Sequence, residues 1–182
     1  MRHLPNLICL IRIALIWPIV AALAASGYRP ALLLFAAAAA SDGLDGYLAK
    51  RFRWTSELGK ILDPLADKLL LVTVFVEAAW LGLIPWWLSA AVVARDCMIG
   101  LGALTFRLWF GPLRGRPTVL SKINTAVQLL YLLLVVLSAA AGQPPRAVLD
   151  AGVALTLVTT VLSGLHYVVS FTRRVWTPAR ST

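Results

Sequence analysis

The feature that most constrains this chain is a series of long apolar runs separated by short polar turns. Sixty per cent of its 182 residues are hydrophobic and only 14% are charged, a balance outside the range of ordinary soluble domains. Several runs reach the roughly 20 residues that an α-helix needs to span a bilayer. A soluble domain of this size cannot bury so much apolar surface. We therefore predict an all-α integral membrane protein.

The turns between the runs predict a bundle of six transmembrane helices. A cleavable signal peptide is a poor alternative for the first run, because the run is too long and Arg12 interrupts it. At that depth Arg12 needs a polar partner. We expect one membrane domain over residues 1–172 and a basic, disordered tail over residues 173–182. The predicted helices cover approximately residues 4–25, 31–52, 58–81, 86–110, 118–141 and 146–171.

Positive charge is distributed unevenly between the two sets of predicted loops. Only Arg29 and Arg146 fall in the loops of one side, and the other loop arginines and lysines share the side of the two termini. The positive-inside rule therefore predicts that both termini are cytoplasmic, as at a bacterial inner membrane. The net charge of +9 is explained by this bias and by contact with anionic lipid, so no nucleic-acid partner is expected.

Acidic residues are concentrated in residues 41–68, between apolar runs. Four of the eight acidic residues are the aspartates Asp42, Asp45, Asp63 and Asp67. The members of each pair are three or four residues apart, so each pair shares one helix face. Two facing helices would gather four carboxylates, which repel one another unless protons or cations intervene. Carboxylate oxygens favour Mg²⁺, Mn²⁺ or Ca²⁺ over zinc. Capping or solvation would explain one such aspartate better than two helically spaced pairs.

Small and basic residues accompany these aspartates. Gly46 and Ala49 continue the face of the first pair, and Gly59 lies one helical turn before Asp63. Small side chains beside carboxylates leave room for a ligand to approach the backbone. Lys50 is one of several cations between the two pairs that could meet a phosphate group.

The complete pattern resembles the signature of the CDP-alcohol phosphatidyltransferases. That signature is Asp, two residues, Asp-Gly, two residues, Ala-Arg, eight residues, Gly, three residues, Asp, three residues, Asp. The chain matches it in register from Asp42 to Asp67, except that Lys50 stands where the family usually has arginine. Lysine keeps the charge but loses the bidentate fork, and Arg51 is the neighbouring alternative. The resemblance implies transfer of a phosphatidyl group from CDP-diacylglycerol to a hydroxyl acceptor, with release of CMP.

The resemblance also implies cofactors, site residues and a homodimer. Two divalent cations, Mg²⁺ or Mn²⁺, would be held by the four aspartates, and Asp67 would be the general base that takes the proton from the acceptor hydroxyl. For Asn6 a helix N-cap role is equally open. The residues that the resemblance assigns to the nucleotide and diphosphate are Asn6, Gly46, Ala49, Lys50 and Gly59.

Two other segments bear on the acceptor. Residues 116–129, together with residues 94–96, most resemble the family members that make cardiolipin from CDP-diacylglycerol and phosphatidylglycerol. Glycerol 3-phosphate, which gives phosphatidylglycerophosphate, is the alternative acceptor. Arg95, Arg116 and Lys122 are the candidates for binding the acceptor phosphate. An ion pair with the next residue is an equally open role for Arg95, and interfacial snorkelling is one for Lys122.

Two alternatives from other functional classes also fit acids in apolar surroundings. Intramembrane carboxylates mark ion pathways in transporters, so an ion-coupled transporter would explain the aspartates. It would not explain the glycines and cations at fixed spacing beside them. A prenyl-diphosphate enzyme would also use paired aspartates, but it would place them in a different pattern.

Overall fold

The computed structural model describes the backbone of residues 4–52, 59–110 and 118–176, and within these the side chains of 10–41, 66–105, 108–109, 118–170 and 172. Over these residues the chain forms α-helices and no strand. The predicted all-helical fold is therefore confirmed. The helices are α1 (Leu4–Ala24), α2 (Tyr28–Phe52), α3 (Gly59–Trp80), α4 (Trp86–Phe110), α5 (Val119–Ala141) and α6 (Arg146–Trp176).

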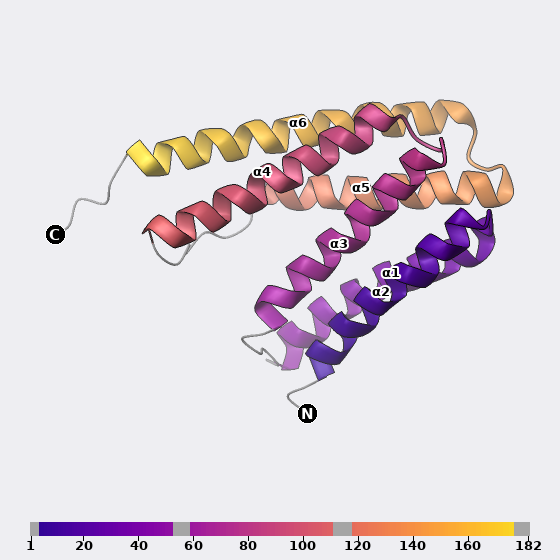
Figure 1. The fold of residues 1–182 in the computed structure, drawn as a ribbon, viewed down its shortest axis with the longest axis horizontal. Helices are drawn as coiled ribbons and strands as arrows, with labels where there is room; N and C mark the ends of the chain where they lie inside the picture. The colour runs from indigo at the N-terminus through magenta and orange to yellow at the C-terminus, as the bar shows by residue number, and fades with distance from the viewer. Residues whose placement is uncertain (1–3, 53–58, 111–117, 177–182) are drawn as a thin grey trace.

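Successive helices run in opposite directions along the bundle (Figure 1). The short turns that join α1 to α2, α3 to α4 and α5 to α6 lie toward one end. α1 packs against both α2 and α3, α5 packs against α2 and α6, and α4 packs against α3 and α6. The start of α1, the end of α2 and the start of α3 therefore meet at the other end of the bundle, which we call the active end (Figure 1).

The hydrophobic core is built from α1 to α5. Each of these helices contributes fully buried side chains, such as Leu23 of α1, Phe35 of α2 and Leu88 of α4. The rings of Phe75 and Tyr131 lie with their centroids 6.4 Å apart where α3 meets α5. α6 adds only partly buried apolar side chains to this cluster, so it packs along one side of the bundle.

The outer surface of the helices is apolar. Among the large exposed side chains are Trp17, Trp80 and Leu33, which a bilayer would accommodate and water would not. Two shorter apolar helices cover Leu10–Ala24 and Tyr28–Ser41. Six spans and cytoplasmic termini remain predictions. Within the described residues, three helices are long and apolar enough to cross a membrane: Trp86–Thr105, Val119–Ala141 and Arg146–Ser170.

Two helix ends differ from the sequence-based expectation. α2 begins at Tyr28 rather than near residue 31, because proline is tolerated in the first turn of a helix and Pro30 need not precede it. α6 continues to Trp176, so the first part of the tail predicted to be disordered is helical. Residues between Phe171 and Trp176 include no glycine or proline, and Pro178 is the first residue that disfavours further helix.

Candidate active site

Asp67 lies on α3 near the active end and is held there from α1. Arg12 donates a hydrogen bond from Nη1 to Asp67 Oδ1. The Arg12 side chain is 3% exposed, whereas that of Asp67 is 33% exposed. The polar partner expected for Arg12 is therefore present. A buried arginine anchors Asp67 and leaves the carboxylate within reach of a ligand.

The other three aspartates of the motif lie on helices that reach the same end. Asp42 and Asp45 belong to α2 and Asp63 belongs to α3, but their side chains are outside the described set. Among the side chains that the structure describes, no group of three or more His, Cys, Asp or Glu residues comes together. The predicted cluster of four carboxylates thus stays a prediction.

The donor atoms of this segment fit a divalent cation. Hard cations such as Mg²⁺ and Mn²⁺ take carboxylate oxygens as ligands, and four aspartates of the segment can supply them. The carboxylate of Asp67 is accessible, and it already forms an ion pair with the guanidinium group of Arg12. The residues that would hold such ions are Asp42, Asp45, Asp63 and Asp67.

The predicted nucleotide-binding residues also lie on helix segments near the active end. Asn6 is within the first turn of α1, so the alternative N-cap role, which requires a position before the helix, is wrong. Gly46, Ala49 and Lys50 lie in the last turns of α2, and Gly59 is the first residue of α3. Contact of these side chains with a nucleotide stays a prediction.

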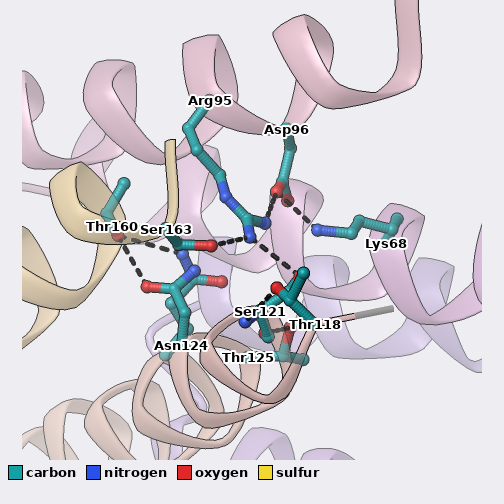
Figure 2. Close-up of polar contacts among 10 residues, drawn as sticks. Lys68, Arg95, Asp96, Thr118, Ser121, Asn124, Thr125, Thr160 and Ser163 are labelled. Atoms are coloured by element: carbon teal, nitrogen blue, oxygen red, sulfur yellow. Dashed lines mark hydrogen bonds and ion pairs between the residues drawn. The ribbon is translucent and has the colours of Figure 1, made fainter. Parts of the chain in front are cut away.

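A second charged group lies where α4 meets α3, α5 and α6 (Figure 2). Arg95 donates from Nη1 to Asp96 Oδ1 at 2.6 Å and from Nη2 to Ser121 Oγ at 2.9 Å. The same Nη2 also donates to Ser163 Oγ of α6. Lys68 of α3 donates from Nζ to Asp96 Oδ1 at 2.5 Å. This charged group, Lys68, Arg95 and Asp96, ties four helices together.

The ion pair expected as one role of Arg95 is therefore present. The Arg95 side chain is 4% exposed, and both of its terminal nitrogens already have partners. Direct contact of Arg95 with an acceptor stays a prediction. Arg116 lies outside the described residues. Lys122, in the first turns of α5, is exposed, which is compatible with either role predicted for it.

The start of α5 places Ser121 for this contact. Thr118 is the N-cap of α5, and its side chain accepts a hydrogen bond from the Ser121 backbone N–H at 3.2 Å. The cap fixes the first turn of the helix. As a result, the Ser121 hydroxyl lies within hydrogen-bond distance of Arg95.

A buried polar seam between α5 and α6 was not anticipated from the sequence. Gln128 Nε2 donates to Thr160 Oγ1 at 3.2 Å, and Thr160 Oγ1 donates to Asn124 Oδ1 at 3.0 Å. Asn124 and Gln128 are fully buried. Their spacing of four residues within an apolar run was the available signal, since such residues share one helix face. In a membrane, hydrogen bonds of this kind hold helices together.

Sequence reasoning also missed the contact of Lys68 with Asp96. The side chain of Lys68 is 37% exposed and lies beside Asp67 on α3, while its partner Asp96 is 5% exposed. The available signal was its position directly after the last aspartate of the motif.

The comparison with known protein families decides how this site is classed. The sequence model of the CDP-alcohol phosphatidyltransferases matches residues 2–169, nearly the whole chain. The chain belongs to the CDP-alcohol phosphatidyltransferase family. Membership of this family favours an enzymatic role for the aspartates over ion transport.

The individual relatives carry the names of two different enzymes of the CDP-alcohol phosphatidyltransferase family. The cardiolipin synthase (CMP-forming) of Rattus norvegicus is 34% identical over 143 residues, covering 70% of this chain and 47% of the rat protein. The enzyme of the same name from Streptomyces coelicolor is 42% identical over 69 residues, 38% of this chain and 32% of that protein. The chain thus spans less than half the length of these two relatives. The CDP-diacylglycerol–glycerol-3-phosphate 3-phosphatidyltransferase of Pectobacterium atrosepticum is 31% identical over 171 residues, 88% of each chain.

Proposed function

We propose that this protein transfers the phosphatidyl group of CDP-diacylglycerol to a hydroxyl of phosphatidylglycerol, which yields cardiolipin and CMP. The observation that carries the proposal is the accessible Asp67 carboxylate at the end of the family motif, anchored by the buried Arg12. The relatives named cardiolipin synthase support the choice of acceptor.

In this mechanism Asp67 is the general base. It accepts the proton of the acceptor hydroxyl, and the hydroxyl oxygen forms a bond to the phosphorus on the lipid side of the donor diphosphate. The bond between that phosphorus and the bridging oxygen breaks, and CMP leaves with the electron pair. Arg12 keeps the Asp67 carboxylate in one orientation through its hydrogen bond, which is what a base needs in order to meet the hydroxyl proton.

Two divalent cations, Mg²⁺ or Mn²⁺, when bound by Asp42, Asp45, Asp63 and Asp67, would stabilise the negative charge of the donor diphosphate. Gly46, Ala49 and Gly59 provide space for the nucleotide, and Asn6 and Lys50 bind its phosphates. Chelation of divalent ions should abolish activity, and adding Mg²⁺ or Mn²⁺ should restore it. Full activity in excess chelator would remove the metal from the mechanism.

We further propose that the enzyme spans the bacterial inner membrane six times as a homodimer, with the active end on the cytoplasmic side. The distribution of loop arginines and lysines supports this orientation, and the apolar outer faces of the helices support insertion.

Glycerol 3-phosphate is the second candidate acceptor, with phosphatidylglycerophosphate as the product. The relative from Pectobacterium atrosepticum favours it, because the alignment covers 88% of both chains. Lys122, Arg116 and Arg95 are the cations proposed near the acceptor phosphate, and they could serve either compound.

A competition assay distinguishes the two acceptors. Purified enzyme in detergent would receive radiolabelled CDP-diacylglycerol with phosphatidylglycerol and glycerol 3-phosphate together, and the products would be separated by chromatography. We expect labelled cardiolipin. Phosphatidylglycerophosphate as the sole product would overturn the cardiolipin assignment and would leave the transfer chemistry standing.

A further inference from the structure

We propose that Lys68 binds the phosphate of the acceptor and thereby selects acceptors in which a glycerol unit separates a phosphate from the reacting hydroxyl. This inference rests on the proposed phosphatidyl transfer. It adds a specificity-determining residue that the family signature ending at Asp67 does not include.

The first argument is the orientation of two consecutive residues on α3. Successive residues on an α-helix point about 100° apart. Asp67 meets α1 through Arg12, and Lys68 meets α4 through Asp96. Both Asp67 and Lys68 are about one third exposed, while the partner of each is almost fully buried. The helix therefore presents an anionic and a cationic group side by side, each anchored by a residue that lies deeper in the bundle.

The second argument is charge. Asp96 Oδ1 accepts hydrogen bonds from both Arg95 Nη1 and Lys68 Nζ, at 2.6 and 2.5 Å. One carboxylate thus faces two cations, and the charged group keeps one net positive charge. The Lys68–Asp96 contact links α3 to α4, but Arg95 alone already neutralises the charge of Asp96. Lys68 therefore supplies a positive charge beyond what the buried pair requires.

The third argument is where this surplus charge is accessible. Arg95 is almost fully buried, and both of its terminal nitrogens have partners on Asp96, Ser121 and Ser163. Lys68 is the most accessible member of the group, with a side chain 37% exposed, and Figure 2 shows its ammonium group directed toward Asp96. An ammonium group has three N–H donors, and the described side chains accept only one of them, at Asp96. The remaining donors suit the oxygens of a phosphate.

The position of Lys68 favours the acceptor over the donor. Asp67 contacts α1 through Arg12, and α1 packs against α2, where the first two aspartates of the motif lie. Lys68 contacts α4 through Asp96, and α4 packs against α6 instead. Lys68 thus faces α4, whereas Asp42 and Asp45 of the proposed donor site lie on α2, which packs against α1.

The chemistry of the candidate acceptors fits this spacing. In phosphatidylglycerol and in glycerol 3-phosphate alike, three glycerol carbons separate the terminal hydroxyl from the phosphate. Asp67 and Lys68 are consecutive residues, with Cα atoms about 3.8 Å apart, and we expect one such unit to lie between the carboxylate and the ammonium group. With the hydroxyl at Asp67, the phosphate lies beside Lys68. Arg95 then acts as a positioning residue, because it holds Asp96 and Asp96 holds the ammonium group.

The test compares steady-state kinetics of wild-type enzyme and variants in detergent micelles. Each substrate, CDP-diacylglycerol and phosphatidylglycerol or glycerol 3-phosphate, is varied while the other is saturating. Lys68→Ala should raise the KM for the acceptor about ten- to a hundredfold, the loss expected for a hydrogen bond to a charged group, and should leave the KM for CDP-diacylglycerol unchanged. Lys68→Arg, which keeps the charge, should recover most of the acceptor affinity.

Arg146→Ala is the matched control, because it also removes one positive charge but is exposed at the start of α6, at the opposite end of the bundle. It should change neither KM. If Lys68→Ala fails to accumulate, Lys68→Gln makes the same comparison while keeping a hydrogen-bond donor for Asp96. An equal rise in both KM values, or no rise in the acceptor KM, would overturn the role of Lys68. Failure of the wild-type enzyme to release CMP with any acceptor would instead refute the proposed function.

Discussion

Replacing either buried member of the charged group of Lys68, Arg95 and Asp96 should destabilise the protein, but the two losses of stability should differ. Asp96→Asn removes the negative charge of the group and leaves Arg95 buried with no counter-ion among the residues that the structure describes. Arg95→Met removes one of two cations and leaves Asp96 paired with Lys68 at 2.5 Å. The aspartate should therefore be the more costly residue to replace, although both side chains are about equally buried.

The expected magnitudes follow from the contacts. Removing one partner of a buried ion pair costs roughly 3–5 kcal/mol when the other charge is left uncompensated, and we expect that loss for Asp96→Asn. Arg95→Met loses the hydrogen bonds to Ser121 and Ser163, at about 0.6 kcal/mol each within membranes, so a total of about 1–2 kcal/mol is expected. The double variant should resemble Arg95→Met, because no buried charge then remains unpaired.

Unfolding in mixed micelles, followed by circular dichroism, measures these free energies. The control is Asp150→Asn, which removes a carboxylate from an exposed position near the start of α6 and should leave the stability unchanged. Greater destabilisation by Arg95→Met than by Asp96→Asn would refute the reasoning. So would a double variant that is less stable than Asp96→Asn alone.

Three further predictions address the base, a helix cap and the topology. Asp67→Asn should lower turnover about 10²–10⁴-fold while the enzyme still binds CDP-diacylglycerol in a direct binding assay; near-normal turnover would remove Asp67 from the role of base. Thr118→Ala should reduce the free energy of unfolding by about 0.5–2 kcal/mol, and Thr118→Ser should restore it; equal stability of both variants would contradict the capping contact. Reporter fusions at Thr182 and near Arg146 should report opposite sides of the membrane, and the same side for both would contradict six spans.

Much of the fold could be predicted because the chain separates its helices clearly. Turns rich in glycine and proline interrupt the apolar runs, and α4 occupies the expected residues. The need of Arg12 for a polar partner was also predictable, because a charge at that depth in an apolar run is costly. The spacing of Asp42 to Asp67 predicted the chemical class, since the signature is long and its positions are fixed.

Contacts between distant helices could not be predicted in the same way. Lys68 and Asp96 are 28 residues apart, and Arg95 and Ser163 are 68 residues apart. Periodicity predicts which residues share a face of one helix, but it does not say which other helix covers that face. Lys68 was therefore missed, although its neighbour Asp67 was identified.

The most direct test of the central claim is acceptor-dependent release of CMP by the purified full chain. The protein in detergent would receive CDP-diacylglycerol labelled in the cytidine, with and without phosphatidylglycerol or glycerol 3-phosphate. We predict release of labelled CMP in a one-to-one ratio with a new phosphatidyl product, only when an acceptor is present, and its loss in Asp67→Asn. Folded wild-type protein that releases no CMP with either acceptor would contradict the account.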